Sequence, residues 1–243
     1  MAGQGDSLPD ATLYRKLVGK LNFLSHTRPD ICFAVQQLSQ YMSDPRYPHW
    51  KAGLHVLKYL STTPSQDILL NNTASFTLQS YCDADWAACP NTRRSVSGYV
   101  ILLGGSLISW KSKKQHTVSL SSAEAEYMSL RRLTAELAWL TRLLAELDVR
   151  DVLPVPVHCD SQVAIHIARN PVFHERTKHI DLDCHFVTEQ LVGGLITLSY
   201  IPSLSQPADL LTKSLSGPQH HVLSDKLGLV SPPSNLRGDV GVG

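Results

Sequence analysis

The sequence predicts an α/β protein in which a mixed sheet is flanked by helices, with an all-helical segment before it. Apolar residues recur at helical spacing through the first 60 residues, and the pattern becomes strand-like from Phe76 onward. Further along the chain, strand-like and helix-like runs alternate, which is typical of α/β folds. The chain has 243 residues and 43% of them are apolar, so it is long enough to bury a core.

The all-helical segment contains three predicted amphipathic helices. Apolar residues lie three or four positions apart within residues 13–24, 31–42 and 54–60. Asp10 is a suitable cap for the first helix, and the proline-containing stretch 45–48 separates the second from the third.

The sheet begins with a predicted three-stranded meander. Strand-like runs occupy residues 76–82, 97–103 and 106–110, and Gly104 and Gly105 form the turn between the last two. A long helix comes next, and the elements after it alternate between strand and helix. They are a helix at 121–147 capped by Ser121 or Ser122, a strand at 155–159, helices at 161–169 and 177–192, a strand at 195–201 and a helix at 209–215.

These elements predict three regions along the chain. Residues 1–70 form the helical segment and residues 75–218 form the α/β domain. Residues 219–243 form a tail that we expect to be largely disordered, because its end is enriched in Gly, Pro and Ser.

Charge and cysteine content limit the class of protein. The formal net charge is +1, so any affinity for nucleic acid must come from local clusters of basic residues. The five cysteines are an odd number without paired C-x-x-C spacing, which favours free thiols in a reducing compartment. With no apolar run of about 18 residues and no signal pattern, we expect a soluble intracellular protein.

Four carboxylates occupy informative positions. Asp83 and Asp160 each end a strand-like run, and Glu126 and Asp209 lie on helix-like runs. Open α/β sheets build their sites at the carboxyl ends of strands, so Asp83 and Asp160 lie close together if their strands are neighbours. Carboxylates are the hard oxygen ligands that Mg²⁺ prefers, and two such ions about 4 Å apart support phosphodiester hydrolysis.

Two of these assignments have rivals in the sequence. A single Asp at a strand end is most often a turn or cap residue. Asp85 shares a strand face with Asp83, so alternation does not separate the two. Glu124 is two residues from Glu126, and helical neighbours two apart do not share a face.

Six short motifs stand out along the chain: Tyr81 to Ala87, Arg93 to Tyr99, Ile108 to Gln115, Val118 to Tyr127, Arg176 to Asp181 and Ala208 to Lys213. Together they resemble the ribonuclease H region of copia-type (Pseudoviridae) LTR retrotransposon polyproteins, particularly plant ones. Residues 12–60 resemble the end of the reverse transcriptase segment that precedes that region. The resemblance covers nearly the whole chain.

The resemblance implies a ribonuclease H-like, mixed five-stranded sheet and a two-metal-ion endonuclease. The implied reaction is hydrolysis of the RNA strand of an RNA/DNA hybrid, leaving 3′-hydroxyl and 5′-phosphate ends. The implied cofactor is Mg²⁺, as two ions, with Mn²⁺ as a substitute. In this scheme Asp83 bridges both ions, Glu126 and Asp160 complete the first site, and Asp209 serves the second. The match of Ala125-Glu126-Tyr127 to the family selects Glu126 over Glu124.

The resemblance also implies partners and a location. The partners are the RNA/DNA hybrid and the polymerase part of a Pol polyprotein, in the cytoplasm within virus-like particles, in the nucleus, or in both. Lys and Arg pair with backbone phosphate, and polar groups near the site can read 2′-hydroxyls. The candidate nucleic-acid contacts are Arg93, Arg94, Lys111, Lys113, Lys114, Ser122, Ser161, Gln162, Lys178 and His179.

The sequence departs from related nucleases and polymerases in two ways. Residues 202–206, before the last Asp, contain no His, although many ribonucleases H carry one there. The Tyr-x-Asp-Asp motif of a polymerase active site is absent, so we expect no polymerisation. Three function classes remain: an active hybrid nuclease, a non-catalytic nucleic-acid-binding module, and an inert or domesticated remnant of a retroelement. Four crowded acids favour the first, because their repulsion costs stability without metal.

Overall fold

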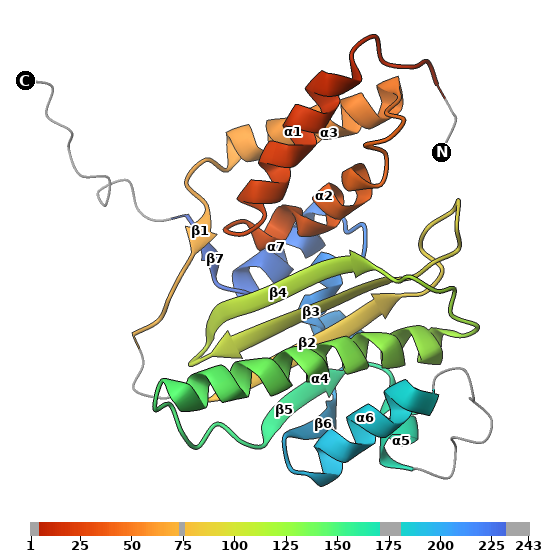
Figure 1. Ribbon diagram of the computed structural model, residues 1–243. Coiled ribbons are helices and arrows are strands. Elements are labelled where there is room, and N and C mark those ends of the chain that lie inside the picture. Colours follow the sequence, from red (N-terminus) through yellow and green to blue (C-terminus); the bar gives the residue numbers. More distant parts are fainter. Residues whose placement is uncertain (1–4, 73–75, 171–180, 232–243) are drawn as a thin grey trace, which may run out of the picture.

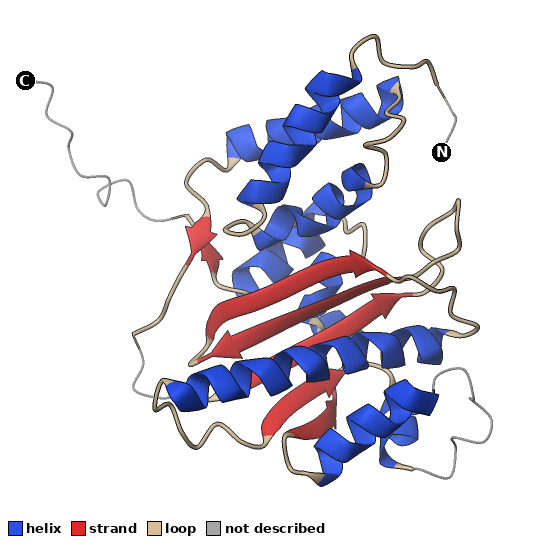
Figure 2. Cartoon of the chain, viewed as in Figure 1, coloured by secondary structure: helices blue, strands red, loops and turns tan. Residues whose placement is uncertain are grey.

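The computed structural model describes residues 5–72, 76–170 and 181–231 (Figure 1). Helices and strands follow one another in a mixed order (Figure 2). They are α1 (Ala11–Leu24), η1 (Pro29–Ile31), α2 (Cys32–Ser39), α3 (Tyr47–Thr62), β1 (Asp67–Ile68), β2 (Leu78–Asp85), β3 (Val96–Leu103), β4 (Ser106–Lys114), α4 (Ser122–Glu146), β5 (Val155–Cys159), α5 (Gln162–Arg169), α6 (Asp181–Val192), β6 (Ile196–Tyr200), η4 (Ser203–Ser205), η5 (Pro207–Leu211), α7 (Gly217–Lys226) and β7 (Leu229–Val230).

The main sheet has five strands in the order β4-β3-β2-β5-β6 within the described part of the chain. Strands β2, β3 and β4 form an antiparallel meander, β5 runs parallel to β2, and β6 runs parallel to β5. The predicted α/β class with a mixed five-stranded sheet is therefore confirmed. Because Cys82 of β2 and Cys159 of β5 are register partners, Asp83 and Asp160 follow them at the same edge of the sheet.

Helix α4 covers one face of the sheet, with α5 and α6 beside it (Figure 1). Its apolar stripe packs into the main core, where Leu130, Leu133 and Leu137 are fully buried against strand residues such as Ile101 and Val157. Burial of an apolar side chain of this size is worth roughly 2 kcal/mol, so this stripe holds α4 in register on the sheet.

The opposite face of the sheet is covered by η5, α7 and α2. Val100 of β3 packs there with Leu211 and Leu223 in a second core. The indole Nε1 of Trp110 on β4 donates a hydrogen bond to the carbonyl oxygen of Ser25, 3.0 Å away. The N-terminal helices therefore pack directly on the sheet. None of the helices in the described residues has the length and apolar character needed to span a membrane.

The three N-terminal helices form as predicted, but in two of them the buried face only partly matches the predicted apolar stripe. Leu13, Leu54 and Leu57 of the predicted stripes are exposed. Tyr14 is fully buried instead, and its hydroxyl donates a hydrogen bond to the carbonyl oxygen of Leu38. Neighbouring helical residues differ in direction by about 100°, so burying Tyr14 turns Leu13 outward.

The predicted tail contains ordered elements. Helix α7 begins at Gly217, and β7 pairs antiparallel with β1, placing Leu229 opposite Ile68. Leu223 and Leu227 are buried in the second core, which outweighs the polar character of this segment. The expectation of disorder is therefore wrong for residues 219–231, and residues 232–243 lie outside the described residues. The boundary near residue 70 stays a prediction.

Candidate active site

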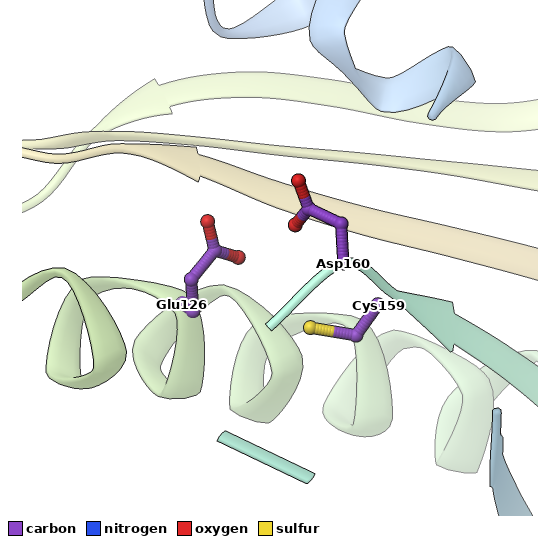
Figure 3. Close-up of side chains that lie close together, drawn as sticks. All are labelled: Glu126, Cys159 and Asp160. Carbon is purple, nitrogen blue, oxygen red and sulfur yellow. The ribbon is translucent and has the colours of Figure 1, made fainter. Parts of the chain in front are cut away.

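The four predicted carboxylates come together at one edge of the sheet. Asp83 is near the end of β2, Asp160 follows β5, Glu126 is in the second turn of α4, and Asp209 is on η5. A carboxylate oxygen of Glu126 and one of Asp160 lie with the Cys159 sulfur within 4.8 Å of one another (Figure 3). The ammonium group of Lys213 contacts both Asp83 and Asp209.

The start of α4 explains why Glu126, and not Glu124, faces this edge. The Ser121 hydroxyl accepts a hydrogen bond from the Glu124 amide, and Glu124 Oε2 accepts one from the Leu120 amide at 2.8 Å. This reciprocal cap uses Glu124 to begin the helix. Glu126 Oε1 instead accepts a hydrogen bond from the Ala84 amide, beside Asp83.

Buried polar side chains hold α4 against the sheet. The Ser129 hydroxyl donates to the carbonyl oxygen of Asp83 at 2.8 Å. Gln115 Nε2 donates to the Ser97 hydroxyl and to the Ala125 carbonyl oxygen, and the Ser119 hydroxyl donates to Gln115 Oε1. No sequence pattern points to these positioning residues, because isolated Ser and Gln residues look the same whether they form a buried hydrogen bond or are solvated.

Asp209 lies on a short 3-10 helix, not on the predicted helix 209–215. The Gln206 side chain caps η5 by accepting from the Ala208 amide, and its Nε2 donates to the Cys82 carbonyl oxygen at 3.0 Å. Gly98 of β3 lies beneath, where a Cβ would come within 2.7 Å of Thr212 Cγ2. The capping bond to β2 and the close approach of β3 together place Asp209 at the site.

Lys213 joins two of the carboxylates. Its Nζ lies 3.0 Å from Asp83 Oδ1 and 2.7 Å from Asp209 Oδ1. The Thr212 hydroxyl donates to the other oxygen of Asp83. Burial acts to lower the pKa of Lys213, but the carboxylates of Asp83 and Asp209 outweigh it and raise that pKa. Lys213 lies in the motif Ala208 to Lys213, but the sequence alone assigns it no role.

Burial and crowding raise the pKa values of Asp83, Glu126 and Asp209. Burial, and then the charge of Asp83, raise the pKa of Glu126 to about 10 and that of Asp209 to about 7. Burial also raises the pKa of Asp83, against the opposing charge of Lys213. Glu126 Oε2 is buried without a hydrogen-bond partner among the described residues. A site of crowded carboxylate oxygens, one of them unpaired, fits a hard divalent cation.

Asp83 is a better candidate ligand than its rival Asp85. Asp83 is fully buried and holds Lys213 and Thr212, whereas Asp85 is partly exposed, closer to the end of β2.

The predicted basic contacts divide between several surfaces. Arg93 and Arg94 lie in the loop between β2 and β3, at the same sheet edge as the carboxylates. Lys111 and Lys113 are exposed, whereas the Lys114 ammonium donates to Gln40 Oε1 of α2. Alternation along β4 points Lys114 to the opposite face of the strand from Lys111 and Lys113, so the three lysines do not form one cluster.

The predicted polar contacts lie at helix starts. Ser122 and Gln162 are exposed first residues of α4 and α5. The Ser161 hydroxyl caps α5 by accepting from the Ala164 amide. Lys178 and His179 lie outside the described residues.

The chain is similar in sequence to plant retrotransposon polyproteins. It is 43% identical over 234 residues to the retrovirus-related Pol polyprotein from transposon RE2 of Arabidopsis thaliana, a match that covers 96% of this chain and 16% of that polyprotein. It is 36% identical over 219 residues to the retrovirus-related Pol polyprotein from transposon TNT 1-94 of Nicotiana tabacum, covering 90% of this chain and 16% of the relative. The chain thus spans 16% of the length of these relatives.

Among solved structures, the chain is similar to LC11-RNase H1 isolated from compost, with 20% identity and a TM-score of 0.41 over 56% of this chain and 93% of that one. No family model matches the sequence. The matches to plant Pol polyproteins extend over nearly the whole chain, which is therefore similar along its length to one segment of copia-type retrotransposon Pol polyproteins.

Proposed function

We propose that this chain is a metal-dependent endonuclease that hydrolyses the RNA strand of RNA/DNA hybrids. The observation that carries the proposal is the meeting of Asp83, Glu126, Asp160 and Asp209 at one sheet edge, where burial and mutual repulsion raise the pKa values of Glu126 and Asp209. Several carboxyl groups with shifted pKa values at one site are typical of catalytic centres.

The carboxylates provide ligands for two Mg²⁺ ions, with Mn²⁺ as a substitute. Asp83 lies between the two halves of the site, Glu126 and Asp160 form one half, and Asp209 forms the other. The Lys213 ammonium contacts Asp83 and Asp209 in the Asp209 half, and this pairing supports a preference for positive charge there. When bound, the ions would supply Lewis acidity and an activated water for attack on the scissile phosphodiester.

The chain's own residues would bind and orient the hybrid. Arg93 and Arg94 lie at the catalytic edge and are our candidates for phosphate contacts, which carry no sequence information. Ser122 and Gln162 are exposed at the starts of α4 and α5 and are our candidates for contact with 2′-hydroxyls. In the longer Pol polyprotein we propose the polymerase part as the partner that holds the substrate.

A cleavage assay on a labelled RNA/DNA hybrid in Mg²⁺, with a chelator control, tests this function. Asp83→Asn and Asp209→Asn should each lower the rate by at least about 100-fold, the scale of a lost acid, base or metal ligand. Asp85→Asn, a change of the same kind two residues along β2, should retain most of the rate. Equal cleavage of hybrid and duplex DNA by the unmodified chain, or loss of activity in Asp85→Asn alone, would refute the assignment.

One observation favours a second candidate, a nucleic-acid-binding module without catalysis. Lys213 neutralises part of the charge on Asp83 and Asp209, so the site is partly balanced without divalent ions. Hybrid binding in a chelator, together with no cleavage in Mg²⁺ or Mn²⁺, would support this alternative.

A further inference from the structure

Cys159 places a sulfur atom beside two of the candidate metal ligands. Its Sγ and one carboxylate oxygen each of Glu126 and Asp160 all lie within 4.8 Å of one another (Figure 3). The proposed hydrolysis makes no use of this sulfur, because Mg²⁺ prefers hard oxygen ligands.

Strand geometry explains why the thiol is there. The burial pattern of β5 alternates, and Cys159 is fully buried on the face toward α4, the helix that carries Glu126. The Ser161 amide donates to Sγ at 3.4 Å, and Asp160 is the next residue in the chain. Cys159 is a free thiol.

Glu126 offers an unused ligand atom at the same place. The residue is only 8% exposed, and its Oε2 is buried without a hydrogen-bond partner in residues 5–72, 76–170 and 181–231. Buried polar atoms normally have a hydrogen-bond partner. An unpaired carboxylate oxygen beside a thiol is therefore available to coordinate a cation.

We propose that Glu126, Cys159 and Asp160 form a site for a thiophilic divalent cation, specifically Zn²⁺. Thiolate ligands favour such ions over Mg²⁺. Three protein ligands with the fourth, open position of a tetrahedron taken by water is a common zinc arrangement, with Zn–S of about 2.3 Å and Zn–O of about 2.0 to 2.2 Å. On binding, a Zn–S bond replaces the S–H bond of Cys159 and a Zn–O bond replaces the O–H bond of the protonated Glu126 carboxyl. Both protons pass to solvent, without oxidation or reduction.

This site shares Glu126 and Asp160 with one half of the proposed magnesium centre. Zn²⁺ bound there would exclude Mg²⁺ from that half, so the chain would be inhibited by zinc. Asp209 and Lys213 lie on the other half, held by the ion pair with Asp83, and take no part. The inhibition rests on the proposed function, whereas the binding does not.

Binding is tested with Cd²⁺, whose thiolate complexes absorb in the ultraviolet by sulfur-to-metal charge transfer. The full chain is used with Cys32, Cys89 and Cys184 replaced by serine, which leaves Cys82 and Cys159. We expect one equivalent of Cd²⁺ to produce the absorption, Zn²⁺ to displace it, and Cys159→Ser to abolish it. Cys82→Ser is the matched control, because Cys82 is the buried register partner of Cys159, and it should retain the absorption.

The carboxylate ligands are tested in the same background. Glu126→Gln and Asp160→Asn should each weaken Cd²⁺ binding at least tenfold, and Asp209→Asn should leave it unchanged. Cys159→Ala serves as a second variant if the serine variant does not fold. Absorption that survives both Cys159 variants, or binding unaffected by the Glu126 and Asp160 changes, would overturn the proposal.

Inhibition gives an independent readout in the unmodified chain. The ratio of cleavage rates with and without micromolar Zn²⁺, at fixed Mg²⁺, is compared between this chain and Cys159→Ser. We expect the concentration for half-inhibition to rise at least tenfold in the variant, and equal inhibition of both chains would contradict a role for the sulfur. A chain without any Mg²⁺-dependent cleavage would refute the proposed function and leave the Cd²⁺ result standing.

Discussion

Lys213 is the charge that balances the crowded carboxylates when no divalent ion is bound. Its ammonium lies within 3.0 Å of oxygens from Asp83 and Asp209, and its side chain is only 30% exposed. Asp83 is fully buried, and a buried carboxylate that loses its partner is left with an uncompensated desolvation cost.

Replacing Lys213 should therefore destabilise the metal-free chain. We expect Lys213→Ala to lower the free energy of unfolding in a chelator by about 2 kcal/mol, the scale of breaking a mostly buried ion pair. Mg²⁺ should restore part of the loss, because it supplies charge to the same carboxylates. Urea denaturation with and without Mg²⁺ measures both effects. Lys111→Ala, an exposed lysine on β4, should change stability by less than about 0.5 kcal/mol. Equal losses of unfolding free energy in Lys213→Ala and Lys111→Ala would show that Lys213 does not balance the carboxylate charge.

The raised pKa values of Glu126 and Asp209 set how stability depends on pH. A carboxyl group whose pKa is raised by folding keeps its proton at pH values where the unfolded chain has lost it. Its stabilising contribution is thus present below the unfolded pKa and is lost as pH rises through the folded pKa. The windows run from 3.8 to about 7 for Asp209 and from 4.5 to about 10 for Glu126.

We therefore expect the metal-free chain to lose stability as the pH rises from 5 to 9. Each group contributes a slope of at most about 1.4 kcal/mol per pH unit inside its window. Glu126→Gln should flatten the slope between pH 7 and 9, where Asp209 no longer contributes. Glu146→Gln, an exposed residue on the same helix, should leave the slope unchanged. Chemical denaturation in a chelator at each pH provides the measurement, and an unchanged slope in Glu126→Gln would show that Glu126 is ionised throughout.

At the scale of elements, the site depends on how closely η5 approaches β3. Gly98 allows this approach, since a Cβ there would lie 2.7 Å from Thr212 Cγ2 and 2.8 Å from Leu211 Cβ. Because η5 carries Asp209, and Lys213 follows it, a displaced η5 would move two of the charged groups of the site.

Gly98→Ala should accordingly destabilise the chain by about 1 to 3 kcal/mol, the usual range for overpacking. It should also lower Mg²⁺-dependent cleavage more than it lowers stability, because Asp209 is displaced in molecules that remain folded. Gly19→Ala is the matched control. A Cβ at Gly19 meets nothing within 4 Å, and alanine favours the helix by up to about 1 kcal/mol. Thermal melting and cleavage rates of both variants provide the comparison. If Gly98→Ala changed neither stability nor cleavage rate, η5 could move away from β3 without affecting the site.

At the scale of the whole molecule, the N-terminal helices are joined to the rest of the chain at several places. Trp110 on β4 donates a hydrogen bond to Ser25, and β1 pairs with β7 next to α7 (Figure 1). These contacts link residues that precede the predicted boundary near residue 70 to the side of the sheet that η5 and α7 cover. Such contacts favour cooperative unfolding of the two regions over independent folding of residues 1–70.

We expect the helices and the sheet to unfold together. Two variants that keep a single tryptophan, Trp50 on α3 or Trp110 on β4, report on the two parts by fluorescence. Their urea midpoints should agree, as coincident probes do in a two-state transition. Circular dichroism at the same urea concentrations checks that the tryptophan replacements themselves do not shift unfolding. Midpoints that differ clearly would mean that residues 1–70 fold as a separate domain.

The sequence by itself determined those features that local patterns encode. Alternating apolar residues placed Asp83 and Asp160 at strand ends, and helical spacing identified α4 and the three N-terminal helices. Local patterns do not say which helix face is buried: helical spacing predicts Leu13 inside, whereas the structure buries its neighbour Tyr14. They also left Asp85 as a rival to Asp83.

Only the tertiary structure decided which groups meet. Lys213 reaches Asp83 across 130 positions of sequence, and Ser129 reaches it across 46. Glu124 and Glu126 differ in role because one caps α4 and the other faces β2. Contacts of this kind depend on how packed elements are oriented in space, and no short-range periodicity contains that information. The sequence thus identified the carboxylates. Packing determined their pKa values, the ammonium group that pairs with two of them, and the position of the sulfur atom beside the other two.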